Sequence, residues 1–233
     1  MFVMVTVALI GADGAGKTSV AHALERSREL AVKTIYMGVN SEASDHMLPT
    51  TRALLAVRRA LGRGRDQGGP PDPARVRERA QGGLRGLARG TRSALLVLNQ
   101  VCEEWYRVAL ARHFERRGFV VVFDRHFFAD YWAHDVVPTE GRRSLARRVH
   151  GRLLARLPRP DCTILLDAPA SVLFARKAEG TLEALERRRQ EYLELRTRLG
   201  NCALIDATRP AHEVQAEVLA ILRGLCAKGA ARS

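Results

Sequence analysis

Residues 11 to 18 have the types and the spacing of a loop that binds phosphate. They read Gly-Ala-Asp-Gly-Ala-Gly-Lys-Thr and fit the pattern G-x-x-x-x-G-K-[ST]. Glycines let successive backbone N–H groups point inward at an anion, and the first turn of the following helix adds partial positive charge there. Lys17 can then reach the outer phosphates of a nucleotide, and the Thr18 hydroxyl can ligate magnesium. The nest of N–H groups draws on Gly11, Gly14, Ala15 and Gly16.

A second pair of candidate residues, Asp124 and Arg125, follows the apolar run Phe119 to Phe123. Ligands of a parallel sheet bind at the carboxyl ends of its strands, so an acid at this point lies beside the phosphate loop. Asp124 is therefore a candidate to hold magnesium, directly or through water. The guanidinium of Arg125 can clamp a second phosphate through two parallel hydrogen bonds. The alternatives are an aspartate that caps the next helix and a surface arginine; we favour the functional interpretation of both residues.

These residues need a scaffold in which strands alternate with helices. The apolar run of residues 3–10 predicts a first strand that is buried on both faces. Further strands are expected at 31–37, 119–123, 162–167 and 202–205. Helices are expected at 19–30, 51–61, 92–117, from 127, at 142–157, at 171–199 with a break near Gly180, and at 210–225. The alternation predicts an α/β fold of three layers, with helices on both faces of a five-stranded parallel sheet.

Length and composition set the broad class. The 233 residues suffice for one large domain, and 46% hydrophobic with 27% charged residues are typical of a globular protein. The glycine- and proline-rich stretch at about 62–74 is expected to be a flexible insertion in that domain. The net charge of +13 comes from arginines spread along the chain, without a basic block interleaved with aromatic residues. We therefore expect no nucleic-acid partner and attribute part of the charge to an anionic substrate.

The cysteines and the N-terminus bear on the compartment. The 4 cysteines show neither C-x-x-C pairing nor the spacing of zinc ligands, and they fit buried free thiols in a reducing compartment. The N-terminus lacks a basic n-region and a cleavage site, and no apolar run approaches membrane-spanning length. We therefore expect a cytoplasmic protein that does not associate with membranes.

Two motifs together resemble the thymidylate kinase branch of the P-loop nucleoside monophosphate kinases. They are Asp13-Gly-Ala-Gly-Lys-Thr and Val-Val-Val-Phe-Asp124-Arg125-His126. Weaker likenesses support them in the penultimate strand, the start of the lid, the helix after the lid and the last strand. These are Asp161-Cys-Thr-Ile-Leu-Leu-Asp167-Ala-Pro169, Leu173-Phe-Ala-Arg176, Arg188 with Tyr192, and Leu204-Ile-Asp206-Ala. The resemblance covers most of the chain except about residues 38–95.

The resemblance implies one P-loop kinase domain over residues 1–233 that uses ATP and Mg²⁺, with a short lid at about 176–188. Arg125 would grip the acceptor phosphate, Asp13 would sit near the acceptor sugar hydroxyl, and Arg176 would lie by the adenine and the transferring phosphate. The donor phosphates would be cradled by Gly14, Gly16, Lys17, Thr18 and Ser19. The catalytic groups would be Lys17, Arg125, Arg176 and Asp13. The family is dimeric, which implies a homodimer.

The helix before Asp124 leaves the identity of the acceptor open. In the family this helix carries an aromatic residue, with an arginine four positions later, and the two read thymine. The aligned residues of this chain are Val97 and Val101. The family's Phe-Pro-x-Arg acceptor loop is represented by Leu48-Pro49-Thr50-Thr51-Arg52, one residue out of register.

Other polar and aromatic side chains receive structural interpretations. We expect Trp105 and Tyr106 to belong to the core and Glu104 to be a solvated charge. The arginines of the basic helix are expected to form a solvated face: Arg142, Arg143, Arg147 and Arg148. We assign no catalytic role to His126 or His134, since neither has metal-binding partners in the sequence.

The sequence favours an ATP- and magnesium-dependent phosphotransferase whose small acceptor is a nucleoside monophosphate, either dTMP or a related nucleotide. One alternative is a kinase of a hydroxyl on a sugar, nucleoside or natural product, in which Asp13 or Asp124 accepts the hydroxyl proton. An alternative of another class is a nucleotide-binding regulatory or nucleic-acid-associated protein. A phosphate-clamping Arg125 is required by the first function and is optional in the other two.

Overall fold

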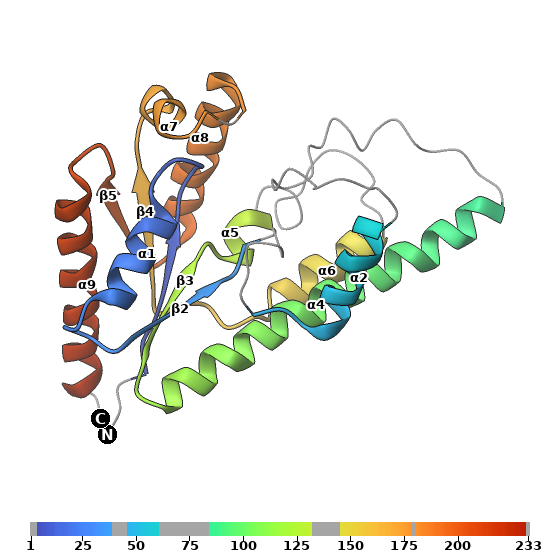
Figure 1. The fold of residues 1–233 in the computed structure, drawn as a ribbon, viewed down its shortest axis with the longest axis horizontal. Coiled ribbons are helices and arrows are strands. Elements are labelled where there is room, and N and C mark those ends of the chain that lie inside the picture. The colour runs from blue at the N-terminus through green and yellow to red at the C-terminus, as the bar shows by residue number, and fades with distance from the viewer. Residues whose placement is uncertain (1–3, 39–45, 61–83, 132–144, 179, 232–233) are drawn as a thin grey trace.

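The computed structural model describes residues 4–38, 46–60, 84–131, 145–178 and 180–231. Its centre is a five-stranded sheet in the order β2-β3-β1-β4-β5, and all neighbouring strands are parallel (Figure 1). The strands are β1 (Thr6–Ile10), β2 (Val32–Tyr36), β3 (Val120–Asp124), β4 (Cys162–Asp167) and β5 (Cys202–Asp206). The predicted α/β fold is confirmed, and the last four strands lie within one residue of their expected bounds.

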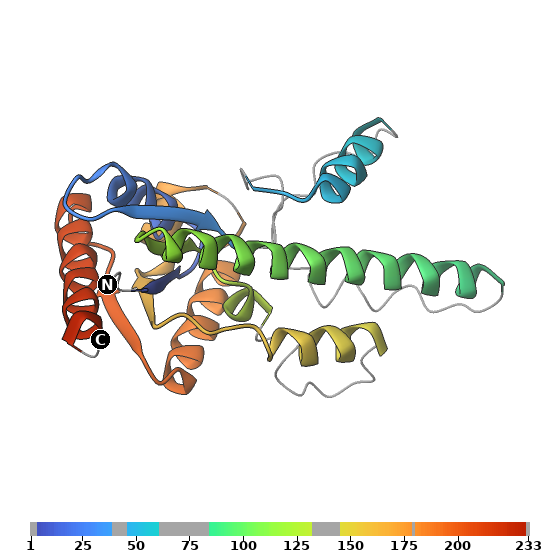
Figure 2. The same ribbon diagram turned by 90° about the horizontal axis from the view of Figure 1, so that it is seen from below.

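Helices cover both faces of the sheet. They are α1 (Lys17–Arg26), α2 (Pro49–Ala60), α4 (Leu84–Arg116), α5 (Phe127–Tyr131), α6 (Leu145–Leu154), α7 (Ala170–Arg176), α8 (Leu182–Arg198) and α9 (Ala211–Ala231). Helices α1 and α9 supply apolar side chains to the core on one face, and α4 and α8 supply those on the other. Helix α4 runs along the long axis of the molecule, with α2 and α6 on either side of it (Figure 2).

Strand β1 shows why the first apolar run of the chain has no polar alternation. Val7 and Leu9 belong to the core beneath α1 and α9, whereas Ala8 and Ile10 belong to the core beneath α4 and α8. Successive residues of a strand point to opposite faces, so a central strand covered on both faces needs apolar side chains throughout. This central position places the carboxyl end of β1, where the phosphate loop begins, between β3 and β4.

Two helix boundaries test the sequence prediction in opposite ways. The long helix α4 begins at Leu84, well before the expected residue 92, because glycine costs a helix interior only about 1 kcal/mol and a long helix tolerates this. The expected break near Gly180 is confirmed. Helix α7 ends at Arg176, and α8 begins after Thr181, whose hydroxyl caps it by accepting a hydrogen bond from the N–H of Ala184 at 3.2 Å.

Several expectations concern residues beyond the described ranges or remain predictions. The proposed insertion at 62–74, Arg142 and Arg143 lie outside the described residues, as do the side chains of Arg147 and Arg148. The single-domain organisation and the lid at 176–188 stay predictions. All four cysteines are free thiols, but only Cys162 is buried. Cys202 and Cys226 are partly buried and Cys102 is exposed, so the expectation of buried thiols is confirmed for Cys162 alone and is wrong for Cys102. None of the described helices is long and apolar enough to cross a membrane.

Candidate active site

The loop between β1 and α1 requires glycine at two positions because of close backbone approaches. Gly11 has a φ of 143° and Gly14 a φ of 88°, and side-chain-bearing residues rarely adopt either value. A Cβ on Gly11 would lie 2.4 Å from the carbonyl oxygen of Leu166 in β4. A Cβ on Gly14 would lie 2.5 Å from the carbonyl oxygen of Leu173 in α7. The loop is therefore packed directly against the backbone of β4 and α7.

Lys17 lies inside the loop that precedes it. Its side chain is buried, and Nζ donates hydrogen bonds to the carbonyl oxygens of Gly11 and Ala12, both at 2.8 Å. Helix α1 begins at Lys17, so its first N–H groups face the same space as the ammonium group. The combination makes the end of β1 strongly electropositive and suited to a polyphosphate.

Asp124 ends β3 beside the loop, and its two carboxylate oxygens differ in their contacts. Oδ2 accepts a hydrogen bond from the Thr18 hydroxyl at 2.6 Å. Oδ1 is the one buried side-chain oxygen or nitrogen, among the residues that the structure describes, without a hydrogen-bond partner. Buried polar groups are nearly always satisfied, so an orphaned carboxylate oxygen points to a missing ligand such as a cation.

The chemistry of Asp124 and Thr18 fits magnesium. Mg²⁺ prefers oxygen ligands and is commonly held by one or two protein groups together with substrate phosphates and waters. The described part of the chain contains no group of three or more His, Cys, Asp or Glu side chains that could hold a metal ion alone. An ion shared between Asp124, Thr18 and a bound nucleotide is consistent with both observations.

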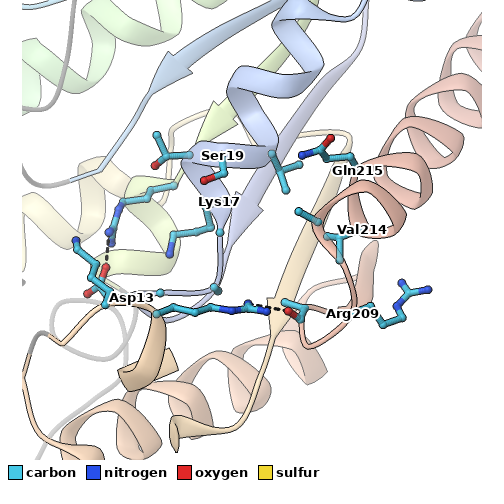
Figure 3. Close-up of a pocket in the computed structure, with 16 residues that line it drawn as sticks. Asp13, Lys17, Ser19, Arg209, Val214 and Gln215 are labelled. Carbon is cyan, nitrogen blue, oxygen red and sulfur yellow. Dashed lines mark hydrogen bonds and ion pairs between the residues drawn. The ribbon is translucent and has the colours of Figure 1, made fainter. Parts of the chain in front are cut away.

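Arg125 forms an ion pair with Asp13 across the mouth of the loop (Figure 3). Its φ of 70° is the one positive φ of a non-glycine residue in the described chain, and its N–H donates to the carbonyl oxygen of Leu9 at 3.0 Å. Burial raises the pKa of Asp13, but the charges of Arg125 and Lys17 outweigh it and hold the pKa below its ordinary value. The pair is therefore ionised near pH 7. Burial lowers the pKa of the neighbouring His126 to about 4, which leaves that ring neutral.

A cavity of about 480 Å³ extends from the phosphate loop to the start of α9. Figure 3 shows Asp13 and Lys17 toward one end and Arg209 and Gln215 toward the other. Arg176, at the end of α7, donates a hydrogen bond to the carbonyl oxygen of Ala207 at 2.7 Å and lines the same cavity. The cavity brings together most of the residues expected in the site: Asp13, Gly14, Ala15, Gly16, Lys17, Thr18, Ser19, Arg125 and Arg176. Gly11 and Asp124 do not line the cavity, but they accept hydrogen bonds from Lys17 and Thr18, which do.

The cavity also contains residues that the sequence analysis did not single out. Lys177 follows Arg176, Arg209 follows β5, and Val214 and Gln215 lie in the first turns of α9. A weaker signal for Arg209 was present in the sequence, because it lies in the loop after the carboxyl end of a predicted strand, four residues beyond Ile205. The residues from α9 carried no such signal.

Two expectations about helix α4 are wrong. Glu104 is 1% exposed, and one of its carboxylate oxygens lies 2.9 Å from Nε2 of His150 in α6. Trp105 and Tyr106 are 39% and 36% exposed and do not belong to the core. The inner face of α4 continues from Glu104 to Val108 at the helical spacing of four, which leaves the two aromatic side chains on other faces.

The sheet order, the glycine loop and the acid at the end of β3 define a P-loop fold of the α/β class. No known family model matches the chain. A similar solved structure is a thymidylate kinase from Candida albicans, described as having broad substrate specificity. The two structures superpose with a TM-score of 0.59 and 15% sequence identity, over 94% of this chain and 91% of that chain. The chain therefore has a thymidylate kinase-like fold, as its motifs predicted.

Proposed function

We propose that the protein is an ATP-dependent phosphotransferase that transfers the γ-phosphate of ATP to a nucleoside monophosphate, either dTMP or a related nucleotide. One observation carries the proposal: the phosphate loop, the Asp13–Arg125 pair and Arg176 border a single cavity. A donor polyphosphate on the loop and an acceptor phosphate at Arg125 would then face each other. The thymidylate kinase-like fold supports the assignment.

In the proposed reaction the chain contributes alignment and charge rather than a strong base, because the acceptor phosphate oxygen is already anionic. The N–H groups of the loop and Lys17 hold the donor phosphates, and Arg125 holds the acceptor phosphate in line with them. In this proposal Arg176, which lines the same cavity, neutralises charge on the transferring group and borders the adenine. Magnesium, which Asp124 and Thr18 would hold, supplies Lewis-acid neutralisation of the donor phosphate oxygens.

The state of Asp13 favours a phosphate acceptor over a hydroxyl acceptor. A kinase of a hydroxyl group benefits from a carboxylate that accepts the hydroxyl proton, and an effective base has a pKa near the working pH. The pKa of Asp13 is held below its ordinary value, and its carboxylate already pairs with Arg125. Asp124 accepts a hydrogen bond from the Thr18 hydroxyl and has its second oxygen without a partner, which fits a metal ligand better than a base.

The decisive experiment is an ADP-release screen of nucleoside monophosphates, nucleosides and sugars, with magnesium and ATP. We expect turnover with a nucleoside monophosphate. Lys17→Ala should abolish ADP production with the fold intact, whereas Arg125→Ala should raise the acceptor KM or lower kcat without weakening ATP binding. Turnover with a nucleoside or sugar alone would establish the hydroxyl kinase instead. Salt-sensitive binding of DNA or RNA without acceptor-dependent ADP release would establish the regulatory or nucleic-acid-associated class.

We also propose that the protein is a homodimer that pairs through the outer face of α4. Leu95, Leu98 and Trp105 are 66%, 58% and 39% exposed, and their spacing with Cys102 alternates three and four residues, as in a helix-pairing seam. Exposed apolar side chains in such a row mark an interaction surface. Sedimentation should show a dimer, and Leu98→Glu with Trp105→Glu should give a monomer.

A cytoplasmic location stays a prediction.

A further inference from the structure

Arg107 is a fully buried arginine on the inner face of α4, with 0% of its surface exposed. Its Nε and Nη2 donate to one carboxylate oxygen of Glu103 at 3.2 and 3.0 Å. Its Nη1 donates to the carbonyl oxygens of Tyr36 at 3.1 Å and Gly38 at 3.2 Å. The guanidinium carbon also lies 5.4 Å from the ring centroid of Phe127. One side chain therefore joins α4 to the end of β2 and to the start of α5.

These contacts reach two segments that lie next to the backbone of Asp124 and Arg125. Between the two carbonyl groups that Arg107 holds lies Met37, whose N–H donates to the carbonyl oxygen of Asp124 at 3.0 Å. On the other side, Phe127 follows Arg125 by two residues. The guanidinium of Arg107 therefore contacts two segments next to Asp124 and Arg125. One is the segment from Tyr36 to Gly38, which is hydrogen-bonded to the end of β3, and the other is the start of α5.

The aliphatic stem of Arg125 lies directly against the segment that Arg107 holds. A Cβ added to Gly38 would lie 2.6 Å from Cδ of Arg125 and 2.4 Å from the hydroxyl oxygen of Tyr36. The φ of 70° at Arg125 is unfavourable for a residue with a side chain and persists only where neighbouring structure holds it. The direction of the Arg125 side chain therefore depends on where the backbone of Gly38 lies.

The partner of Arg107 extends the same scaffold to α2. The second carboxylate oxygen of Glu103 accepts hydrogen bonds from the N–H of Leu48 at 3.0 Å and from the Thr51 hydroxyl at 2.8 Å. Thr51 also accepts a hydrogen bond from the Asn99 side chain of α4 at 2.9 Å. Buried ion pairs are seldom more stable than apolar side chains of similar size, so stability alone does not explain this pair.

We propose that Arg107, with Glu103, is a positioning residue that orients Arg125 toward the acceptor and fixes α2 to the same scaffold. The proposal rests on the proposed function, because it presumes that Arg125 holds an acceptor phosphate. It makes two predictions for a variant without the ion pair. The Asp13–Arg125 pair should weaken even without substrate, and acceptor turnover should fall while ATP still binds.

The test compares the double variant Glu103→Gln, Arg107→Met with a control that removes a partly exposed pair, Glu25→Gln, Lys33→Met. In the control pair, Nζ of Lys33 lies 2.8 Å from the Glu25 carboxylate, and the two side chains are 40% and 30% exposed. Each double variant removes one negative and one positive charge. The glutamine at 103 keeps an acceptor oxygen for the hydrogen bonds to Leu48 and Thr51 of the α2 region. The Asp13 carboxyl is titrated by ¹³C NMR, and the acceptor kcat and KM and the ATP Kd are measured for both.

We expect the pKa of Asp13 to rise in the double variant toward the value in an Arg125→Met reference, because the stabilising cation is displaced. We expect kcat/KM for the acceptor to fall about 10- to 100-fold, as for a misplaced binding group, at an unchanged ATP Kd. The control should change none of these values. If the double variant does not fold, Arg107→Lys gives the same comparison, because an ammonium cannot span both carbonyl groups and Glu103.

An unchanged Asp13 pKa together with unchanged acceptor kinetics in a folded variant would overturn the positioning role. A parallel loss of ATP affinity would also overturn it, since the effect would then be general. The titration does not require turnover, so it separates this inference from the proposed function. If wild-type protein releases no ADP with any acceptor, the proposed function fails, while the Asp13 titration still decides whether Arg107 orients Arg125.

Discussion

Replacing Asp124 with asparagine should leave the free protein at least as stable but should remove its response to magnesium. In the wild type, a buried carboxylate has one oxygen bonded to Thr18 and one without a partner. A buried charged group without a partner costs more free energy than a neutral one. The amide of asparagine still accepts a hydrogen bond from Thr18, so the free energy of unfolding of the variant should be about 1 kcal/mol higher than that of the wild type. For a chain of this size, 1 kcal/mol corresponds to a rise in Tm of about 2 to 4 °C.

With nucleotide and magnesium bound, the Tm of Asp124→Asn should instead fall below that of the wild type. A nucleotide at 100 times its Kd stabilises the folded state by about 2.7 kcal/mol, which raises Tm by roughly 5 to 10 °C. In Asp124→Asn the part of this rise that depends on magnesium should disappear, and turnover should disappear with it. Differential scanning calorimetry with and without Mg²⁺ and ATP, followed by an ADP-release assay, measures both effects.

Asp161, an exposed carboxylate at the amino end of β4, provides a control for the removal of charge. One of its carboxylate oxygens accepts hydrogen bonds from the N–H of Thr6 at 2.8 Å and from the Thr6 hydroxyl at 2.9 Å. Asp161→Asn removes charge from a satisfied carboxylate, so Tm should fall and the magnesium response should remain. A fall in Tm for Asp124→Asn, with the magnesium-dependent rise retained, would refute the assignment of Asp124 as a metal ligand.

Three further predictions concern stability and nucleotide binding. The folded-state pKa of Asp13 is depressed, so its pair with Arg125 stabilises the fold fully above the ordinary aspartate pKa of 3.8. That stability is lost as the pH falls through the lower folded-state pKa, and acid titration of unfolding should show this. Glu104→Ala should lower the free energy of unfolding by about 1 to 3 kcal/mol in urea, because the hydrogen bond to His150 is lost. Gly14→Ala should weaken ATP binding in calorimetry, because its Cβ would lie 2.5 Å from a carbonyl oxygen of α7.

Each of these predictions has its own control. In Arg125→Met the difference in stability from the wild type should shrink below pH 3.8, and a constant difference would contradict the ion pair. Glu104→Gln keeps an acceptor oxygen and should restore most of the stability that alanine loses. Gly200→Ala, where an added Cβ meets nothing within 4 Å, should leave ATP affinity unchanged.

The strands and the phosphate loop were predictable because local signals determine them. β4 lies at Cys162–Asp167, as predicted, since an apolar run between a proline and an acidic end fits one buried parallel strand. The break before α8 was predictable because Gly180 and the capping Thr181 stop one helix and start the next. Such signals lie within a few residues of the structure that they determine.

The polar interior of α4 was not predictable from those signals. Glu104 is buried because its partner, His150, comes from α6, 46 residues further along the chain. Arg107 is buried because two carbonyl groups at the end of β2, about 70 residues earlier, accept its hydrogen bonds. In a sequence with many arginines, nothing near Arg107 distinguishes it from the arginines of a solvated helix face.

The two ends of the sheet treat polar groups differently, and this difference is itself an argument for a ligand site. At the amino end, the carboxylate of Asp161 is exposed and accepts hydrogen bonds from Thr6 of β1. At the carboxyl end, Asp124 has an orphaned oxygen and the next residue, Arg125, has a left-handed backbone. Each feature costs on the order of 1 to 3 kcal/mol, and the buried Arg107 contacts the chain on both sides of them. Folding alone gives no reason to place two unfavourable features on consecutive residues, whereas a site there for a cation and an anion would explain why both are retained: the cation would satisfy Asp124, and the backbone of Arg125 would direct its guanidinium at the anion.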